Sequence, residues 1–263
     1  IPIAIGAGDF LFMTTCKNCE NTFEGKYCPN CSQKADTHRF TLKHFGHEFF
    51  HAFTHTDKGI FFLMKELFIH PGKVAREFNA GKRKKYFNPI TYLLIVMALQ
   101  IYLSQKTGIN GYYLEQIQLQ TQEVNTVPNP ELEKTTELMK NVEQEILEHS
   151  KLINFLFLPI LACFTWMLFR RAGSNYAEVL VFDVLWMAQI LLLFIILCIV
   201  PFLIYPPSVL VTMNIYAFVV IAYMIISLKQ FFLQGWLATI LQGILFQLLY
   251  YITMFILMLA IVA

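Results

Sequence analysis

The feature that most constrains this sequence is a long C-terminal stretch that almost lacks charge. Residues 152–263 hold only five charged side chains, whereas soluble domains carry about one charged residue in four. Helices can cross lipid because they satisfy their own backbone hydrogen bonds. We therefore predict an all-α polytopic membrane protein, and a soluble globular domain is excluded. The five charged residues are Arg170, Arg171, Glu178, Asp183 and Lys229.

Five segments are long and apolar enough to be transmembrane helices, which need about 20 residues each. Pro201 is expected to bend the third of them, and "YPPS" at 205–208 is expected to form a tight turn into the fourth. Together with a loop at 105–151, the five spans make up a membrane domain of residues 87–263. The predicted spans are residues 89–104, 152–169, 177–205, 209–228 and 236–263.

The basic residues indicate how the spans are oriented, because cytoplasmic loops are enriched in lysine and arginine. Residues 14–86 hold 13 basic and 7 acidic side chains, whereas the loop 105–151 holds 4 basic and 8 acidic ones. Arg170 and Arg171 follow the second span, and Lys229 follows the fourth. All of these basic groups fall on one side if the N-terminus is cytoplasmic. The loop 105–151 and the C-terminus are then predicted to be extracytoplasmic.

Three short regions precede the membrane domain. Residues 1–13 are apolar but too short to span a membrane, and they lack the basic start of a signal peptide. We interpret them as a misassigned start or as a short apolar arm that packs on the membrane domain. Residues 14–36 contain four closely spaced cysteines. Residues 37–86 are expected to form amphipathic helices at the cytoplasmic membrane surface.

Four of the six cysteines have the spacing of ligands to a structural zinc ion. "CKNC" and "CPNC" are two C-x-x-C knuckles joined by eight residues, enough for a small hairpin with Gly25 at its turn. Two disulfides are the alternative, but the charge pattern places these residues in the cytoplasm, where thiols stay reduced. Four thiolates leave no open coordination position, so the predicted ribbon holds one structural Zn²⁺. The predicted ligands are Cys16, Cys19, Cys28 and Cys31.

The sequence "HEFFH" at 47–51 matches the H-E-x-x-H motif of zinc proteases. In a catalytic interpretation, His47 and His51 bind a metal ion and Glu48 activates a bound water. We favour the alternative, in which residues 41–55 form an interfacial helix with histidines on one face and phenylalanines on the other. The motif lies within a longer run of histidines, and no motif for a third ligand follows it. A second, non-catalytic metal site is a further alternative.

The segment between this helix and the first span is also predicted to lie at the membrane surface. Residues 60–69 are too short to cross a membrane, so we expect a second interfacial or re-entrant helix that stops at "PG", residues 71–72. The basic run "KRKK" then adjoins the first span and anchors its cytoplasmic end. This run is also a candidate for binding anionic lipid headgroups. Its residues are Lys82, Arg83, Lys84 and Lys85.

Two features of the predicted membrane domain leave alternatives open. Asp183 lies inside the third span, where a carboxylate usually faces a partner or a watery cavity. We expect it to form a helix-packing hydrogen bond or to pair with Arg170, Arg171 or a basic residue near Lys82. The loop 105–151 is either a helical hairpin that caps the spans or a docking surface for a partner.

Taken together, these blocks resemble an uncharacterised family of bacterial membrane proteins with an N-terminal four-cysteine zinc ribbon and several transmembrane helices. The similar segments are "HEFFHAFTHTDKG", "KELFIHPGKVAREFNAGKRKKYFNPITYLL" and "NYAEVLVF". The resemblance covers most of the chain from Met13 and implies a bacterial inner membrane. It implies no reaction, because the family has none assigned. The chain departs from the expected pattern after "EVLVF", where "DVLWMAQ" replaces a polar or histidine-bearing segment.

The function that we expect is that of a non-enzymatic accessory or scaffold subunit in a larger membrane complex. It would contact membrane lipids and a protein partner through the ribbon, the histidine-rich helix or the outer loop. One alternative is a zinc-dependent membrane hydrolase that uses the HEFFH motif. A second is a small-solute or lipid transporter built around Asp183, which is less favoured because few polar residues converge at the midplane. No nucleotide-binding motif is present, and no nucleic-acid partner is expected.

Overall fold

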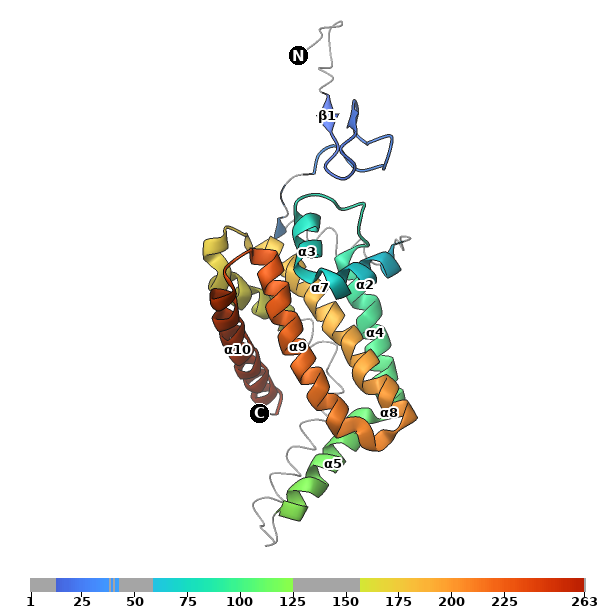
Figure 1. Ribbon diagram of the computed structural model, residues 1–263, viewed down its shortest axis with the longest axis vertical. Coiled ribbons are helices and arrows are strands. Elements are labelled where there is room, and N and C mark those ends of the chain that lie inside the picture. The colour runs from blue at the N-terminus through green and yellow to red at the C-terminus, as the bar shows by residue number, and fades with distance from the viewer. Residues whose placement is uncertain (1–12, 38, 40, 43–58, 125–156, 263) are drawn as a thin grey trace, which may run out of the picture.

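The chain folds into a small cysteine-bearing ribbon followed by helices that run side by side (Figure 1). The computed structural model describes residues 13–37, 39, 41–42, 59–124 and 157–262. The ribbon contains the strands β1 (Thr14–Thr15) and β2 (Thr22–Phe23), which pair antiparallel. Nearly all the rest of the described chain is helical. This confirms the prediction of a mostly helical protein with a small cysteine-bearing ribbon at its N-terminal end.

Four long helices make up most of the bundle. They are α4 (Pro89–Thr107), α7 (Tyr176–Phe194), α9 (Val209–Phe232) and α10 (Trp236–Val262). The start of α4 is set by Asn88, whose side chain accepts hydrogen bonds from the backbone N–H groups of Ile90 and Thr91. Its end is set by Gly108, which has a φ of 66°. Residues 157–169 form a further helix that leads into the short 3₁₀ turn η1 (Arg170–Ala172).

The predicted distortion at Pro201 takes the form of a π turn. Helix α7 continues without a break into η2 (Ile195–Ile199), which has π geometry, and then into α8 (Val200–Ile204). Proline has no backbone N–H to donate within the helix, and an insertion of this kind accommodates the missing bond. The "YPPS" sequence forms the predicted tight turn as η3 (Pro206–Ser208), which leads directly into α9.

Among the described residues, three helical stretches are long and apolar enough to cross a membrane: Tyr176–Ile204, Pro206–Phe232 and Trp236–Thr253. They coincide with the third, fourth and fifth predicted spans. The first predicted span, residues 89–104, corresponds to α4. This helix continues for three further residues, 105–107, all of which are polar. Only residues 157–169 of the second predicted span are described, and they are helical. The chain therefore has the helices of a membrane protein, while the number of spans stays a prediction.

The core of the bundle is centred on α7. Side chains all around this helix are buried, as expected for a helix that is hydrophobic on every face. Aromatic rings add to the packing near the start of α7, where Phe169 stacks on Phe232 with centroids 4.1 Å apart and Phe182 stacks on Phe231 at 4.7 Å. In contrast, α9 and α10 leave large apolar side chains exposed, which suits helices whose outer faces contact lipid.

Two short helices lie at the end of the bundle nearest the ribbon (Figure 1). Helix α2 (Ile60–Ile69) has the bounds that the sequence predicts, and it buries Leu63 and Leu67. The prediction that residues 71–72 only stop α2 was incomplete, because Pro71 is the first residue of a new helix, α3 (Pro71–Asn79). Proline fits there because the first turn of a helix needs no N–H from it.

Helix α3 contacts α9 at the backbone. A Cβ atom on Gly72 would lie 2.1 Å from the Ser227 carbonyl oxygen and 2.5 Å from the Phe231 nitrogen. The contact is fixed by two hydrogen bonds to Gln230: its Oε1 accepts from Gly72 N at 3.2 Å, and its carbonyl oxygen accepts from Arg76 Nη1 at 2.7 Å. Only glycine allows this close approach, so α2 and α3 are tightly attached to the membrane bundle.

The described part of the predicted outer loop is helical. Helix α5 (Ile109–Val124) begins directly after Gly108 and lies at the end of the bundle opposite the ribbon (Figure 1). A helical hairpin was one of the two alternatives predicted for the loop 105–151, and α5 occupies its earlier half. The later half of the loop lies outside the described residues.

Candidate metal centre

The four predicted cysteine ligands lie on two knuckles with the same backbone pattern. In the first, Cys16 N donates to Asn21 O at 2.9 Å and Glu20 N donates to Cys16 O at 2.9 Å. In the second, Cys28 N donates to Gln33 O at 2.8 Å, and the N–H of the residue after Cys31 bonds back to Cys28 O at 2.8 Å. Each knuckle is thus a tight turn that directs its backbone N–H groups toward its own sulfurs.

The residue that follows each knuckle adopts a left-handed conformation. Glu20 has a φ of 62° and Ser32 a φ of 57°, although neither is glycine. The strand pairing also differs from the sequence prediction. The expected hairpin in the link between the knuckles is wrong, because β1 and β2 pair across the first knuckle and the Tyr27–Lys34 bridge closes the second. A hairpin around each knuckle holds its two cysteines on the same side, which a hairpin in the link would not do.

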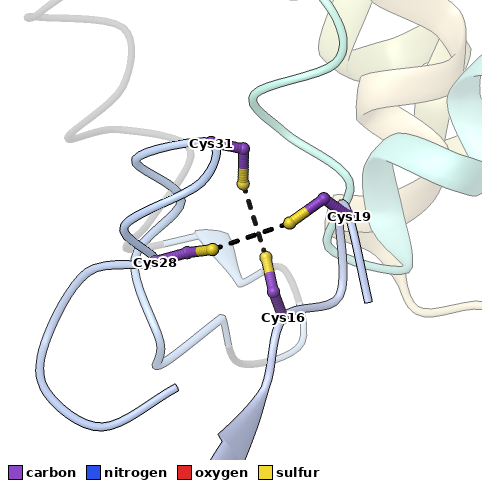
Figure 2. Close-up of side chains that lie close together, drawn as sticks. All are labelled: Cys16, Cys19, Cys28 and Cys31. Atoms are coloured by element: carbon purple, nitrogen blue, oxygen red, sulfur yellow. Dashed lines mark hydrogen bonds between the residues drawn. The ribbon is translucent and has the colours of Figure 1, made fainter. Parts of the chain in front are cut away.

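The four sulfurs point toward one centre (Figure 2). Cys16 Sγ lies 3.5 Å from Cys31 Sγ, and Cys19 Sγ lies 3.6 Å from Cys28 Sγ. All four ligand atoms lie within 4.8 Å of one another, and none of the cysteines is in a disulfide. Sulfurs placed about 2.3 Å from one tetrahedral ion would be separated by about 3.8 Å. The site therefore has the size and shape of a four-sulfur metal centre.

The electrostatics of the knuckles favour a thiolate at two of the four positions. Burial opposes ionisation of Cys28, but hydrogen bonds from the backbone N–H groups of Cys31 and Asn30 outweigh it and lower its pKa to about 6. The pKa of Cys16 is lowered despite burial, by the equivalent N–H groups of Cys19 and Asn18. Burial raises the pKa of Cys31 to about 11. Part of the negative charge that a metal cation requires is therefore stabilised by the fold itself.

The ribbon is attached to the loop that precedes α4. Gln33, which is 3% exposed, donates from Nε2 to the Gly81 carbonyl oxygen at 2.6 Å and accepts from Lys84 N at 3.0 Å. Lys17 donates to the carbonyl oxygen of Thr37 and packs over the same glycine, where a Cβ would lie 2.9 Å from the lysine Cδ. The φ of Gly81 is 105°, so a side chain there would be strained as well as crowded.

The basic run after Gly81 is held by one carboxylate. Glu77 Oε2 accepts from Lys85 Nζ at 2.7 Å and from the Tyr86 hydroxyl at 2.8 Å, and Glu77 Oε1 lies 3.8 Å from Lys82 Nζ. Burial alone would raise the pKa of Glu77, but the hydrogen bonds and the lysine charges lower it to about 2. Lys82 and Lys85 of the predicted headgroup-binding run are therefore paired within the chain, whereas the side chain of Lys84 is exposed.

A second connection ties the segment after the ribbon to the start of α7. Arg39 forms a two-point ion pair with Glu178, from Nε to Oε1 at 2.5 Å and from Nη2 to Oε2 at 2.8 Å. Its Nη2 also donates to the Gly173 carbonyl oxygen at 2.8 Å. Glu178 at the same time completes a capping box with Asn175. Nearby, Asn79 at the end of α3 donates to the Glu178 carbonyl oxygen at 2.9 Å.

The structure describes Asp183 but not the residues of the HEFFH motif. His47, Glu48 and His51 lie outside the described residues, so both interpretations of the HEFFH motif stay predictions. Asp183 is buried and accepts from the Thr165 hydroxyl at 3.3 Å, which is a helix-packing contact rather than a pairing with an arginine. Sequence reasoning missed Gln33 and Arg39, because a single glutamine or arginine next to a knuckle carries no local signal of what it will contact.

Comparison with known proteins gives one local match. A family of proteins of unknown function (DUF3667) matches residues 57–101, which cover α2, α3, the basic run and most of α4. No curated protein and no solved structure matches the chain. The matched segment contains the loop to which the ribbon attaches and the glycine that packs on α9, but it does not include the cysteines.

Proposed function

We propose that this chain is a non-enzymatic scaffold or accessory subunit of a bacterial inner-membrane complex, with one structural Zn²⁺ in its ribbon. The observation that carries the proposal is the attachment of the ribbon to its own membrane bundle through Gln33 and Gly81. A ribbon fixed in this way presents a constant surface next to the membrane. That property suits a docking platform, and a catalytic centre would instead need an open coordination position.

Zinc is favoured by the chemistry of the four ligands. Four cysteine sulfurs in tetrahedral arrangement are typical of zinc or of iron–sulfur centres. Two knuckles that face one another around a single point suit one ion. In such sites the metal supplies much of the folding free energy of a ribbon that has almost no core of its own. Here the buried apolar groups of the ribbon are only Phe23 and the cysteines Cys16 and Cys28.

A five-span topology with a cytoplasmic N-terminus is part of the proposal. The ribbon, α2, α3 and the turn between α9 and α10 lie at one end of the bundle, and α5 and η3 lie at the other (Figure 1). This arrangement supports passes by α4, the helix that includes 157–169, α7, α9 and α10 in alternating directions. The basic run, Arg170, Arg171 and Lys229 then share the ribbon end, which the positive-inside rule assigns to the cytoplasm.

The proposed partners are membrane lipids and at least one protein. Lys84, Arg170 and Arg171 have exposed side chains and are the basic groups best able to contact anionic headgroups. Among the four basic residues 82–85, Lys82 and Lys85 already pair with Glu77, so they contribute less to lipid binding. A protein partner is proposed to bind the ribbon, the histidine-rich helix or the outer loop.

The experiment that tests this function measures metal content per chain in purified protein. We expect about one zinc ion in the wild type and none after Cys28→Ser, because three sulfurs no longer close the site. The double variant His47→Ala/His51→Ala should keep its one ion. Two ions in the wild type that fall to one in the double variant would contradict the scaffold function and support the hydrolase. Zinc replaced by iron in freshly isolated protein would contradict the metal assignment.

A further inference from the structure

Helix α7 carries a buried stripe of polar side chains inside the apolar bundle. Asp183, Trp186 and Gln189 follow one another at intervals of three residues, which places them on successive turns along one side of the helix. Their exposed fractions are 0%, 4% and 0%. The helix lies within the stretch Tyr176–Ile204, which is apolar enough to cross a membrane. Polar groups at such a depth are costly and usually functional.

Each of the three side chains keeps one polar atom without a partner. Asp183 Oδ1 accepts from the Thr165 hydroxyl at 3.3 Å, but its Oδ2 has no hydrogen-bond partner. Gln189 Oε1 accepts from the Tyr92 hydroxyl at 2.8 Å, but its Nε2 has none. The indole Nε1 of Trp186, between these two, also has none. One carboxyl oxygen and two N–H donors are thus left unpaired on adjacent turns.

The chemistry of these three groups restricts what they bind. A buried polar group without a partner costs about 1–3 kcal/mol, so three together are rarely left empty. A metal cation is disfavoured because two of the groups are N–H donors, and an anion is disfavoured by the carboxyl group. Water satisfies all three, because it can accept from an N–H group and also exchange hydrogen bonds with a carboxyl group.

The carboxyl group also lacks a charge partner. In the part of the chain that the structure describes, no lysine, arginine or histidine forms an ion pair with Asp183, whereas Glu66, Glu77 and Glu178 are among the carboxylates that do have such partners. Tyr176 at the start of α7 interacts electrostatically with it, and a phenol is uncharged at neutral pH. An isolated carboxylate is very costly in an apolar interior, whereas a carboxylic acid is neutral and can donate to water.

We propose that Asp183, Trp186 and Gln189 form an intramembrane site that holds a proton on Asp183 and one or more bound water molecules. The site is separate from the ribbon and does not depend on the scaffold function. It lies on α7, whose side chains are buried on every face, so the water would be enclosed by the bundle and not by lipid.

The test is infrared spectroscopy of the full-length protein in lipid nanodiscs at neutral pH, with ¹³C-labelled aspartate carboxyls. The chain has four aspartates, at positions 9, 36, 57 and 183. Only a buried neutral acid should show the carbonyl stretch of a protonated carboxyl group at neutral pH. We expect such a band in the wild type, shifted by the ¹³C label. We also expect it to shift in heavy water, because bound water exchanges the proton.

Two variants assign the band. Asp183→Asn should abolish it, and Asp36→Asn, which removes an exposed aspartate, should leave it unchanged. If Asp183→Asn does not fold, the isotope shift in the wild type restricts the band to the four aspartates, and Asp9→Asn, Asp36→Asn and Asp57→Asn should each leave it unchanged. Trp186→Phe should move the band by removing one donor to the water. Absence of the band in the wild type would show that Asp183 is charged and would overturn the proposal. A band that does not shift in heavy water would overturn the bound water.

Discussion

At the scale of single residues, Glu77 concentrates several interactions in one side chain. It binds two lysines and a tyrosine hydroxyl, and it is largely buried, with 17% of its side chain exposed. The lysine partners are about one-third exposed, so solvent screens part of the attraction. The fall of its pKa from 4.5 to about 2 would correspond to about 3 kcal/mol in full. After screening we expect about 1–2 kcal/mol.

This residue predicts a pH dependence of stability. A carboxyl group whose pKa is lower in the folded state stabilises the fold above its unfolded pKa. That contribution is lost as the pH falls from about 4.5 to about 2. Glu77→Gln should therefore lower the melting temperature at pH 7, and the difference from the wild type should shrink as the pH falls through this range. Thermal unfolding in detergent, followed by circular dichroism at several pH values, measures the effect.

The variant and the wild type are compared at the same pH. Acid protonates the cysteine ligands equally in both proteins, so its effect on the metal site cancels from the difference in melting temperature. Glu115→Gln serves as the control, since Glu115 is exposed on α5. The interpretation of Glu77 is wrong if its variant melts like the wild type at pH 7, or if the control shows the same pH dependence.

At the scale of elements, the side chain of Gln33 holds the ribbon against the loop before α4. Gln33→Leu would remove both hydrogen bonds of Gln33 while keeping its approximate size. Two hydrogen bonds contribute about 2 kcal/mol. Their loss would raise the population of molecules in which the ribbon is detached from the loop by about 30-fold. We expect faster cleavage by trypsin within residues 82–85 and an unchanged zinc content. Lys34→Ala is a matched control because it changes an exposed neighbour. Equal cleavage rates in both variants would show that Gln33 does not hold the ribbon.

Some of these elements could be predicted from the sequence, and others could not. Helix α2 was predicted with the correct bounds because its apolar run ends at a proline. Helix α3 was missed because a short polar segment that starts at "PG" reads as a turn when the helix that it packs on is not known. The gathering of the cysteines was predicted from spacing alone, since two C-x-x-C knuckles limit the possible geometry. The partners of Gln33 and Arg39 are distant in the chain, and no local pattern encodes them.

At the scale of the whole molecule, the five-span topology can be tested directly. A reporter fused after Ala263 should behave as extracytoplasmic, and one fused after Arg171 as cytoplasmic, because three passes separate the two positions. Activity of fusions to a reporter enzyme that works only outside the cytoplasm measures this. The same location for both fusions would mean an even number of passes between them and would contradict the proposed arrangement.

One consequence of the backbone contact between α3 and α9 concerns evolution. No side chain larger than hydrogen fits at position 72, whatever the rest of the molecule does. A relative that has lost its cysteines, or that has replaced the entire outer loop, should still carry glycine at the equivalent position if it keeps this pair of helices. In a group of sequences too divergent to align over their whole length, that glycine would mark common ancestry, and its loss would mark a lineage in which the two helices have separated.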